Sequence, residues 1–206
     1  MKKFIGIYDY TVVLTYTGLI CALLGIIFAI KGDFTAALLF LGGALLCDTM
    51  DGRVARAKKD RTETEKQFGI QIDSLCDVIS FGVFPAVICI SIGLDSLADY
   101  CLLAIYCLCC VIRLGYFNVL AQNEEPETPK GYHGLPVVGM AMFLPAAFLL
   151  GMWIPPVAFR VLLRCMLILF GCLYILDFRV KKPKMWLLSL LAAVYLIPMT
   201  LILLRK

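Results

Sequence analysis

Four aspartates lie where two apolar stretches of the chain border a short charged segment. Asp48 and Asp51 are three residues apart, and Asp73 and Asp77 are four apart. Residues at either spacing share one face of a helix, so each pair can present two carboxylates to the same side. Clustered carboxylate oxygens suit Mg²⁺ or Mn²⁺, and two such ions about 4 Å apart can clamp a phosphoryl group during in-line attack. The pattern therefore indicates two divalent ions and phosphoryl transfer.

The residues around the aspartates fit a phosphate ligand. Gly52 and Ala55 are small and permit close approach. Arg56 follows Asp48 by eight residues, about two helical turns, and its guanidinium can grip a phosphate through two hydrogen bonds. Gly69 leaves room one turn before the second pair. The sequence has no Walker-type glycine-rich loop, which argues against ATP hydrolysis by that route.

A structural ion-pair cluster of the aspartates with Arg53, Arg56 and Arg113 is the alternative interpretation. Ionisable residues that face the interior of a membrane span are costly, and they are retained mainly where they function. The functional interpretation is therefore preferred here.

Composition places these residues in a membrane protein. Of 206 residues, 62% are hydrophobic and 17% are charged, with a mean hydropathy of +0.91, whereas soluble domains carry about 25% charged residues. We expect an all-α, polytopic fold that forms a single domain over residues 1–206. Seven apolar runs approach the ~20 residues that a spanning helix needs: 12–30, 34–56, 70–92, 98–120, 134–153, 157–177 and 185–204.

The distribution of basic residues predicts the orientation. Most Lys and Arg residues fall at the N-terminus, in the connection between the second and third runs, and in the connection before the seventh run. The positive-inside rule puts these segments in the cytoplasm, so we expect a multi-pass cell-membrane protein with a cytoplasmic N-terminus. The second and third runs are joined by a short connection and should lie antiparallel. Their aspartates then meet at one depth, on the cytoplasmic side.

The stretch "DTMDGRVAR…GIQIDSLCD", residues 48–77, resembles the signature of the CDP-alcohol phosphatidyltransferases, D-x-x-D-G-x-x-A-R…G-x-x-x-D-x-x-x-D. All eight fixed positions are present: Asp48, Asp51, Gly52, Ala55, Arg56, Gly69, Asp73 and Asp77. One departure is the twelve-residue segment 57–68 between the Arg and the next Gly, which is longer than is usual in that family. The extra residues lengthen the connection and leave both helix faces intact.

The resemblance implies a six-helix membrane core, usually dimeric, to which the seventh run adds a transmembrane helix. It implies a CDP-linked lipid donor and two metal ions, Mg²⁺ or Mn²⁺. The metal ligands would be Asp48, Asp51, Asp73 and Asp77, with Asp77 also acting as the general base. The CDP-lipid contacts would be Gly52, Ala55, Arg56 and Gly69. The expected partners are CDP-diacylglycerol, membrane lipids and a second copy of the chain, with no nucleic acid.

Two further stretches, "DSLCDVISFGVFPA" and "RLGYFNV…KGYHGLPVVGMA", are similar to the membrane-integral bacterial phosphatidylserine synthases. This similarity implies that L-serine is the acceptor and that phosphatidylserine and CMP are the products. Arg113 is a reasonable partner for the serine carboxylate, and Ser80 or Asn118 for the rest of the molecule. Two alternatives stay open: Arg113 can pair with the aspartates or snorkel, and Ser80 can serve helix packing.

Other functions compete with this one. A sister synthase that uses glycerol 3-phosphate or an inositol phosphate would need several cations near the site, and the sequence offers Arg113 and Lys130 without a tight cluster. An archaeal-type ether lipid is another possible donor, because we expect the site to recognise the headgroup more than the lipid tails. A small cation-dependent transporter is the non-enzyme alternative, but no pair of broken helices in matching repeats supports it.

Overall fold

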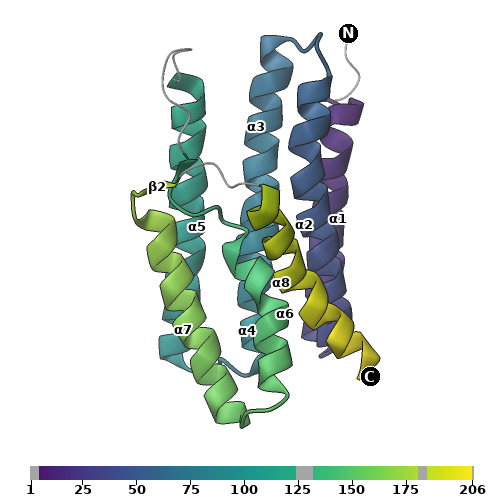
Figure 1. Ribbon diagram of the computed structural model, residues 1–206. Helices are drawn as coiled ribbons and strands as arrows, with labels where there is room; N and C mark the ends of the chain where they lie inside the picture. Colours follow the sequence, from purple (N-terminus) through teal and green to yellow (C-terminus); the bar gives the residue numbers. More distant parts are fainter. Residues whose placement is uncertain (1–4, 124–131, 181–184, 206) are drawn as a thin grey trace.

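The structure is a computed structural model, and it describes residues 5–123, 132–180 and 185–205. The described residues form seven helical rods (Figure 1). In chain order they are α1 (Tyr10–Ile30), α2 (Phe34–Ala57), a continuous rod of α3 (Glu63–Asp77), η1 (Val78–Val83) and α4 (Phe84–Ile92), then α5 (Leu97–Asn123), α6 (Gly139–Gly151), α7 (Pro156–Ile175) and α8 (Met185–Leu204). The strands β1 (Tyr132–His133) and β2 (Arg179–Val180) pair antiparallel.

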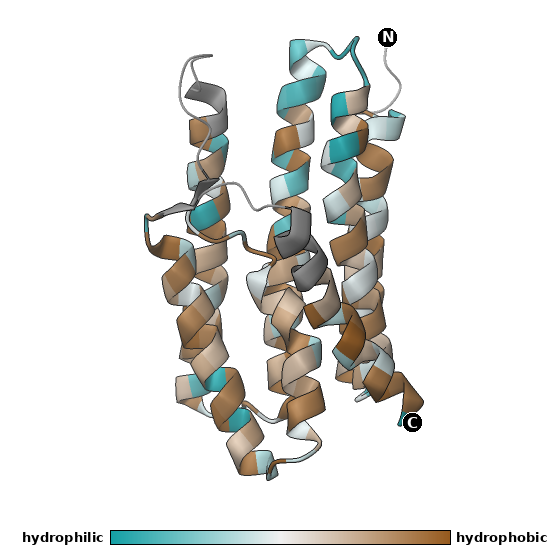
Figure 2. Cartoon of the chain, in the orientation of Figure 1, coloured by the Kyte–Doolittle hydropathy of each residue, from teal (hydrophilic) through white to brown (hydrophobic). Residues whose placement is uncertain are grey.

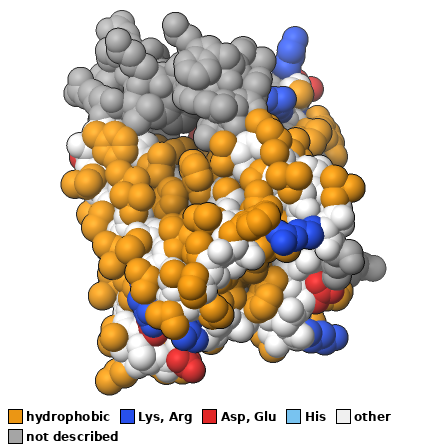
Figure 3. All heavy atoms as spheres, turned by 60° about the horizontal axis from the view of Figure 1, so that its bottom comes forward, with side chains coloured by type: hydrophobic (Ala, Val, Ile, Leu, Met, Phe, Trp, Pro, Cys, Tyr) orange, Lys and Arg blue, Asp and Glu red, His pale blue; other side chains and the backbone are white. Residues whose placement is uncertain are grey.

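The all-α, polytopic fold class is confirmed. Five helices in the described part are long and apolar enough to cross a membrane: α1, α2, the rod 63–92, α5 and α7. Hydrophilic residues gather at the ends of α2 and α3 that the short connection joins (Figure 2). Hydrophobic side chains predominate over the described part of the face in Figure 3, as expected for a surface in contact with lipid.

The expected span 134–153 is wrong in its extent. Helix α6 begins only at Gly139 and has 13 residues, about 20 Å at 1.5 Å per residue, which is less than the ~30 Å hydrocarbon core. The residues before it turn instead of continuing the helix, because Gly134 has a left-handed φ of +67°. Pro145 also interrupts the backbone hydrogen bonding inside α6.

The charged connection is shorter than the sequence suggested. Thr62 caps α3, accepting from the backbone N–H of Glu65, while the Glu65 carboxylate accepts from the N–H of Thr62. This reciprocal cap starts the helix at Glu63. The loop is therefore residues 58–62, and the rest of the polar segment extends α3 by two turns beyond the expected start at residue 70.

Helix α1 packs closely because one of its faces carries small residues. Gly18, Ala22, Gly25 and Ala29 recur every three or four residues and are buried. A Cβ on Gly18 would lie 3.1 Å from the Cβ of Cys47 on α2, so the two backbones approach as small-residue helix pairs do in membranes. Helix α1 contacts α3 and α4 as well, and α5 packs against α7. Helix α1 therefore packs against both α2 and α3.

Candidate metal and substrate site

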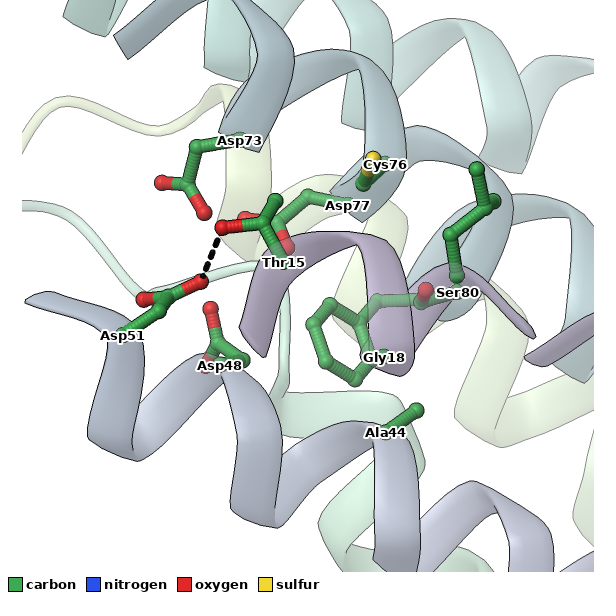
Figure 4. A pocket seen from close by; sticks show the side chains of 11 residues that line it. Thr15, Gly18, Ala44, Asp48, Asp51, Asp73, Cys76, Asp77 and Ser80 are labelled. Carbon is green, nitrogen blue, oxygen red and sulfur yellow. Dashed lines mark hydrogen bonds between the residues drawn. The ribbon is translucent and has the colours of Figure 1, made fainter. Parts of the chain in front are cut away.

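The structure brings the four aspartates together. Asp48 and Asp51 project from α2, Asp73 and Asp77 project from α3, and the carboxylates point toward one another in Figure 4. One carboxylate oxygen each from Asp48, Asp73 and Asp77 lies within 4.8 Å of the others. Asp51 lines the same cavity and is only 7% exposed.

The cavity lies between α1, α2 and the α3–η1 rod. The empty space among its lining atoms is about 200 Å³ when the part open to solvent is included. Its wall is formed by the following residues: Thr15, Gly18, Leu19, Ala44, Asp48, Asp51, Asp73, Cys76, Asp77, Ser80 and Phe81. The carboxylates supply its polar side and the helix faces its apolar side, an arrangement suited to a ligand with an anionic and an oily part.

Carboxylates this close repel one another unless a cation lies between them. Among the described residues, none of the four aspartates forms an ion pair with Lys or Arg. The ion-pair cluster with Arg53, Arg56 and Arg113 is therefore not formed. An all-oxygen donor set of this size fits Mg²⁺ or Mn²⁺.

Thr15 on α1 holds one of the four carboxylates. Its hydroxyl donates a hydrogen bond of 2.9 Å to Oδ2 of Asp51, and both side chains are buried (Figure 4). Sequence reasoning missed Thr15. The signal was present, because Thr15 continues the small-residue face of α1 one turn before Gly18, but a threonine in an apolar run is unremarkable by itself.

A π-helical segment follows Asp77 directly. Ser80 lies within η1, is buried and lines the cavity. The carbonyl of Phe81, also in η1, accepts a hydrogen bond of 2.7 Å from the Tyr106 hydroxyl of α5. Single π-helical turns inside α-helices occur frequently at functional sites.

The structure does not bring Arg113 and Asn118 into the cavity. The Nε of Arg113 donates to the carbonyl of Leu135 at 3.2 Å, and its guanidinium lies 3.9 Å from the centroid of the Phe117 ring. Asn118 accepts from Ser74 and donates to Gln71, at 2.9 and 3.3 Å. Both residues of α5 thus hold neighbouring segments. Lys130 lies outside the described residues.

An arginine side chain lies over each of the two glycines of the signature. A Cβ on Gly52 would lie 3.4 Å from Nη1 of Arg56, which therefore folds back over α2. A Cβ on Gly69 would lie 2.5 Å from Nη2 of Arg61. Ala55 is half-buried and Arg56 is exposed.

A salt-bridge cluster ties three helix ends together beside the cavity. The Lys58 ammonium lies 2.7 Å from Oδ2 of Asp9 and 3.2 Å from Oε1 of Glu65. Burial alone would raise the pKa of Asp9, but the hydrogen bonds from Lys58 and Thr11 outweigh it and lower that pKa to about 2. Asp9 caps α1, so the start of α1 is held against the α2–α3 loop.

Comparison with known proteins adds a family and several relatives. The family model described as CDP-alcohol phosphatidyltransferase matches residues 11–204. A CDP-diacylglycerol–serine O-phosphatidyltransferase of Methanocaldococcus jannaschii is 34% identical over 145 residues, which is 70% of this chain and 61% of that protein. An archaetidylserine synthase of Methanothermobacter thermautotrophicus is 37% identical over 131 residues, 63% of this chain and 53% of that protein.

A third relative comes from Helicobacter pylori. It is a CDP-diacylglycerol–serine O-phosphatidyltransferase, 30% identical over 149 residues, 70% of this chain and 59% of that protein. The chain thus spans about half to six tenths of the length of these curated relatives.

Proposed function

The chain belongs to the CDP-alcohol phosphatidyltransferase family, and we propose that it transfers the phosphatidyl group of CDP-diacylglycerol to the hydroxyl of L-serine. The products are phosphatidylserine and CMP. The observation that carries the proposal is the convergence of the carboxylates of Asp48, Asp73 and Asp77 within 4.8 Å. The choice of serine is supported by the relatives, several of which are named for serine transfer.

The aspartate cluster fits two divalent ions. Asp48, Asp51 and Asp73 would hold them together with Asp77, and their oxygen donors favour Mg²⁺ or Mn²⁺. When bound, such ions neutralise the diphosphate of the donor and favour charge development on the phosphoryl group. Thr15 then orients Asp51 through the hydrogen bond to its Oδ2.

The donor's diphosphate would lie against the cytoplasmic ends of α2 and α3. Gly52 and Gly69 admit the arginine side chains that lie over them there, Ala55 permits close approach, and the Arg56 guanidinium above Gly52 can take a phosphate through two hydrogen bonds. The acyl chains would remain among lipids, beside the apolar surface of the helices.

Asp77 is the proposed general base. Its carboxylate takes the proton of the serine hydroxyl, and the serine oxygen forms a bond to the lipid-side phosphorus. The bond from that phosphorus to the oxygen bridging to CMP breaks, and CMP leaves with the electron pair. Arg56 balances the charge on the departing CMP. Ser80 lies three residues after Asp77 in the same cavity and is the proposed acceptor contact.

Arg113 and Asn118 stay predictions as acceptor residues. Both have partners away from the aspartate cavity, so a serine carboxylate would reach Arg113 only after those contacts rearranged. The cytoplasmic orientation and the homodimer likewise stay predictions. The first is supported by the basic residues that flank the aspartates on α2 and the following loop.

A substrate comparison tests the function. Purified protein in detergent or vesicles is supplied with CDP-diacylglycerol and Mn²⁺ or Mg²⁺, and CMP release is measured with L-serine, glycerol 3-phosphate or an inositol phosphate. We expect release only with serine. Release that depends on a phosphorylated acceptor would indicate instead a sister synthase that uses glycerol 3-phosphate or an inositol phosphate. A parallel donor with ether-linked chains tests the lipid preference that the archaetidylserine synthase relative suggests.

A further inference from the structure

Arg61 is a charged residue of the α2–α3 loop that the signature does not include. Its side chain turns back onto α3, where Nη2 donates to the carbonyl oxygen of Glu65 at 3.0 Å. The same nitrogen lies 2.5 Å from the place of a Cβ on Gly69. The guanidinium therefore lies directly on the Gly69 surface, and the glycine is what admits it.

One donor of this guanidinium has no acceptor. The Nε of Arg61 is buried and is the one buried side-chain nitrogen or oxygen without a hydrogen-bond partner among the described residues. Within that same part of the chain, Arg61 forms no ion pair with Asp or Glu. Buried donors are rarely left unpaired, because the desolvation is then uncompensated. Burial of this donor is thus uncompensated, and no carboxylate in the described part of the chain neutralises the charge of the guanidinium.

The place of Arg61 relative to the aspartates follows from helix geometry. Gly69, Asp73 and Asp77 are successive i, i+4 positions on one face of α3. Arg61 over Gly69 is therefore one turn, about 5.4 Å, beyond Asp73 toward the loop. Neither Arg61 nor Gly69 belongs to the cavity lining, so Arg61 lies beyond the lining residues, toward the α2–α3 loop.

Helix α2 has the same arrangement of arginine, glycine and aspartate as α3, in the opposite direction along the chain. Asp48, Gly52 and Arg56 are also spaced by four residues, and Nη1 of Arg56 lies 3.4 Å from the place of a Cβ on Gly52. Each of the two helices thus carries carboxylates, then a glycine, then an arginine laid over that glycine. Both guanidinium groups thus lie on the loop side of a cluster that can hold divalent ions, and a diphosphate that contacts the ions and extends toward the loop would meet them.

We propose that Arg61 is a second diphosphate-binding residue that acts together with Arg56 on the donor's nucleoside diphosphate. This inference deepens the proposed function and rests on it for the identity of the donor. It assigns the longer connection of this chain a role, because Arg61 lies within the segment 57–68 that exceeds the usual family spacing. The guanidinium would bind non-bridging phosphate oxygens through Nη1, while the hydrogen bond from Nη2 to the carbonyl oxygen of Glu65 would hold the side chain in place.

The test uses the full-length protein with Mn²⁺ and two probes, CDP and inorganic pyrophosphate, with binding measured by calorimetry. Arg61→Ala should weaken binding of both probes about tenfold or more, since a hydrogen bond to a charged group contributes about 1.5–3 kcal/mol. Arg61→Lys should recover only part, because an ammonium lacks the planar fork. Lys59→Ala is the matched control, an exposed cation two residues away, and should change binding less than about twofold.

Kinetics separate binding from a structural role. If Arg61 binds the diphosphate, Arg61→Ala raises KM for the CDP-lipid more than it lowers kcat, at an unchanged melting temperature. If Arg61→Ala lowers the melting temperature but leaves the affinity for both probes unaltered, Arg61 only stabilises the loop, and the inference is overturned. Unaltered affinity in Arg61→Ala, or a wild-type protein that binds neither probe, would overturn it as well. Arg61-dependent pyrophosphate binding without CMP release to any acceptor would instead remove the proposed function and leave the inference standing.

Discussion

Replacing Thr15 by Val isolates the contribution of α1 to the proposed metal site. Valine keeps the shape of threonine and removes the hydroxyl that donates 2.9 Å to Oδ2 of Asp51. Thr15 and Asp51 are each 7% exposed, so water cannot easily replace the lost donor. The substitution therefore leaves a buried carboxylate with one hydrogen bond fewer and free to rotate.

The size of the effect can be worked from this contact. Leaving a buried polar group short of a partner costs about 1–3 kcal/mol, and outer partners of metal ligands are typically worth about 10–100-fold in metal affinity. We expect Thr15→Val to raise the Mn²⁺ or Mg²⁺ concentration for half-maximal CMP release about tenfold. Turnover at saturating metal should fall much less, because no group that reacts is removed.

The assay is a metal titration of CMP release at saturating CDP-diacylglycerol and serine. Thr15→Ser is the rescue variant, because it keeps the hydroxyl. Thr17→Val is the matched control: the Thr17 side chain is exposed on the same helix and donates only to the carbonyl of Val13. An unchanged metal dependence in Thr15→Val, or an equal shift in Thr17→Val, would refute the idea that Thr15 orients a metal ligand.

Three further predictions follow from the same structure. Asp77→Asn should lower CMP release by at least about 10²-fold with a melting temperature near that of the wild type, and near-normal turnover would remove Asp77 from the base role. The Arg164 guanidinium donates to both oxygens of Asp99, at 2.6 and 2.9 Å. Arg164→Ala should therefore lower the melting temperature more than Arg164→Lys does. The metal dependence should stay unchanged, because the proposed metal ligands lie near the loop end of α2 and α3; a shifted metal curve would show that the two ends are coupled. The pKa of Asp9 is lowered from 3.8 to about 2, so the stability that Asp9 gains from Lys58 is present above pH 3.8 and is lost as the pH falls through about 2. The difference in melting temperature between the wild type and Asp9→Asn should shrink over that interval, and a constant difference would contradict the lowered pKa.

The polar groups around the cavity find hydrogen-bond partners on neighbouring helices. The α1 face supplies Gly18 and Thr15, so one helix both packs closely and orients a carboxylate. The π-helical turn after Asp77 adds Ser80 to the wall, and the Tyr106 hydroxyl donates a hydrogen bond to the Phe81 carbonyl within that turn. Each device satisfies a polar group where lipid offers no partner.

Part of this protein could be predicted from its sequence because the relevant patterns are local. Helical periodicity places Asp48 with Asp51 and Asp73 with Asp77, and long apolar runs predict the helices that the structure contains. A short connection between two such runs makes them antiparallel neighbours, and this is enough to bring the pairs to one depth. The family signature depends on the same local spacing.

Other features were decided by contacts between distant segments. Thr15 meets Asp51 across 36 positions of the chain, and Arg113 lies at Leu135 instead of at the aspartates. Helix α6 ends up shorter than its apolar run, and Arg61 turns back onto Gly69. Periodicity determines which face of a helix a residue occupies, but the partner on that face depends on how the helices pack. That packing is settled by small residues, prolines and buried hydrogen bonds acting together across the whole fold.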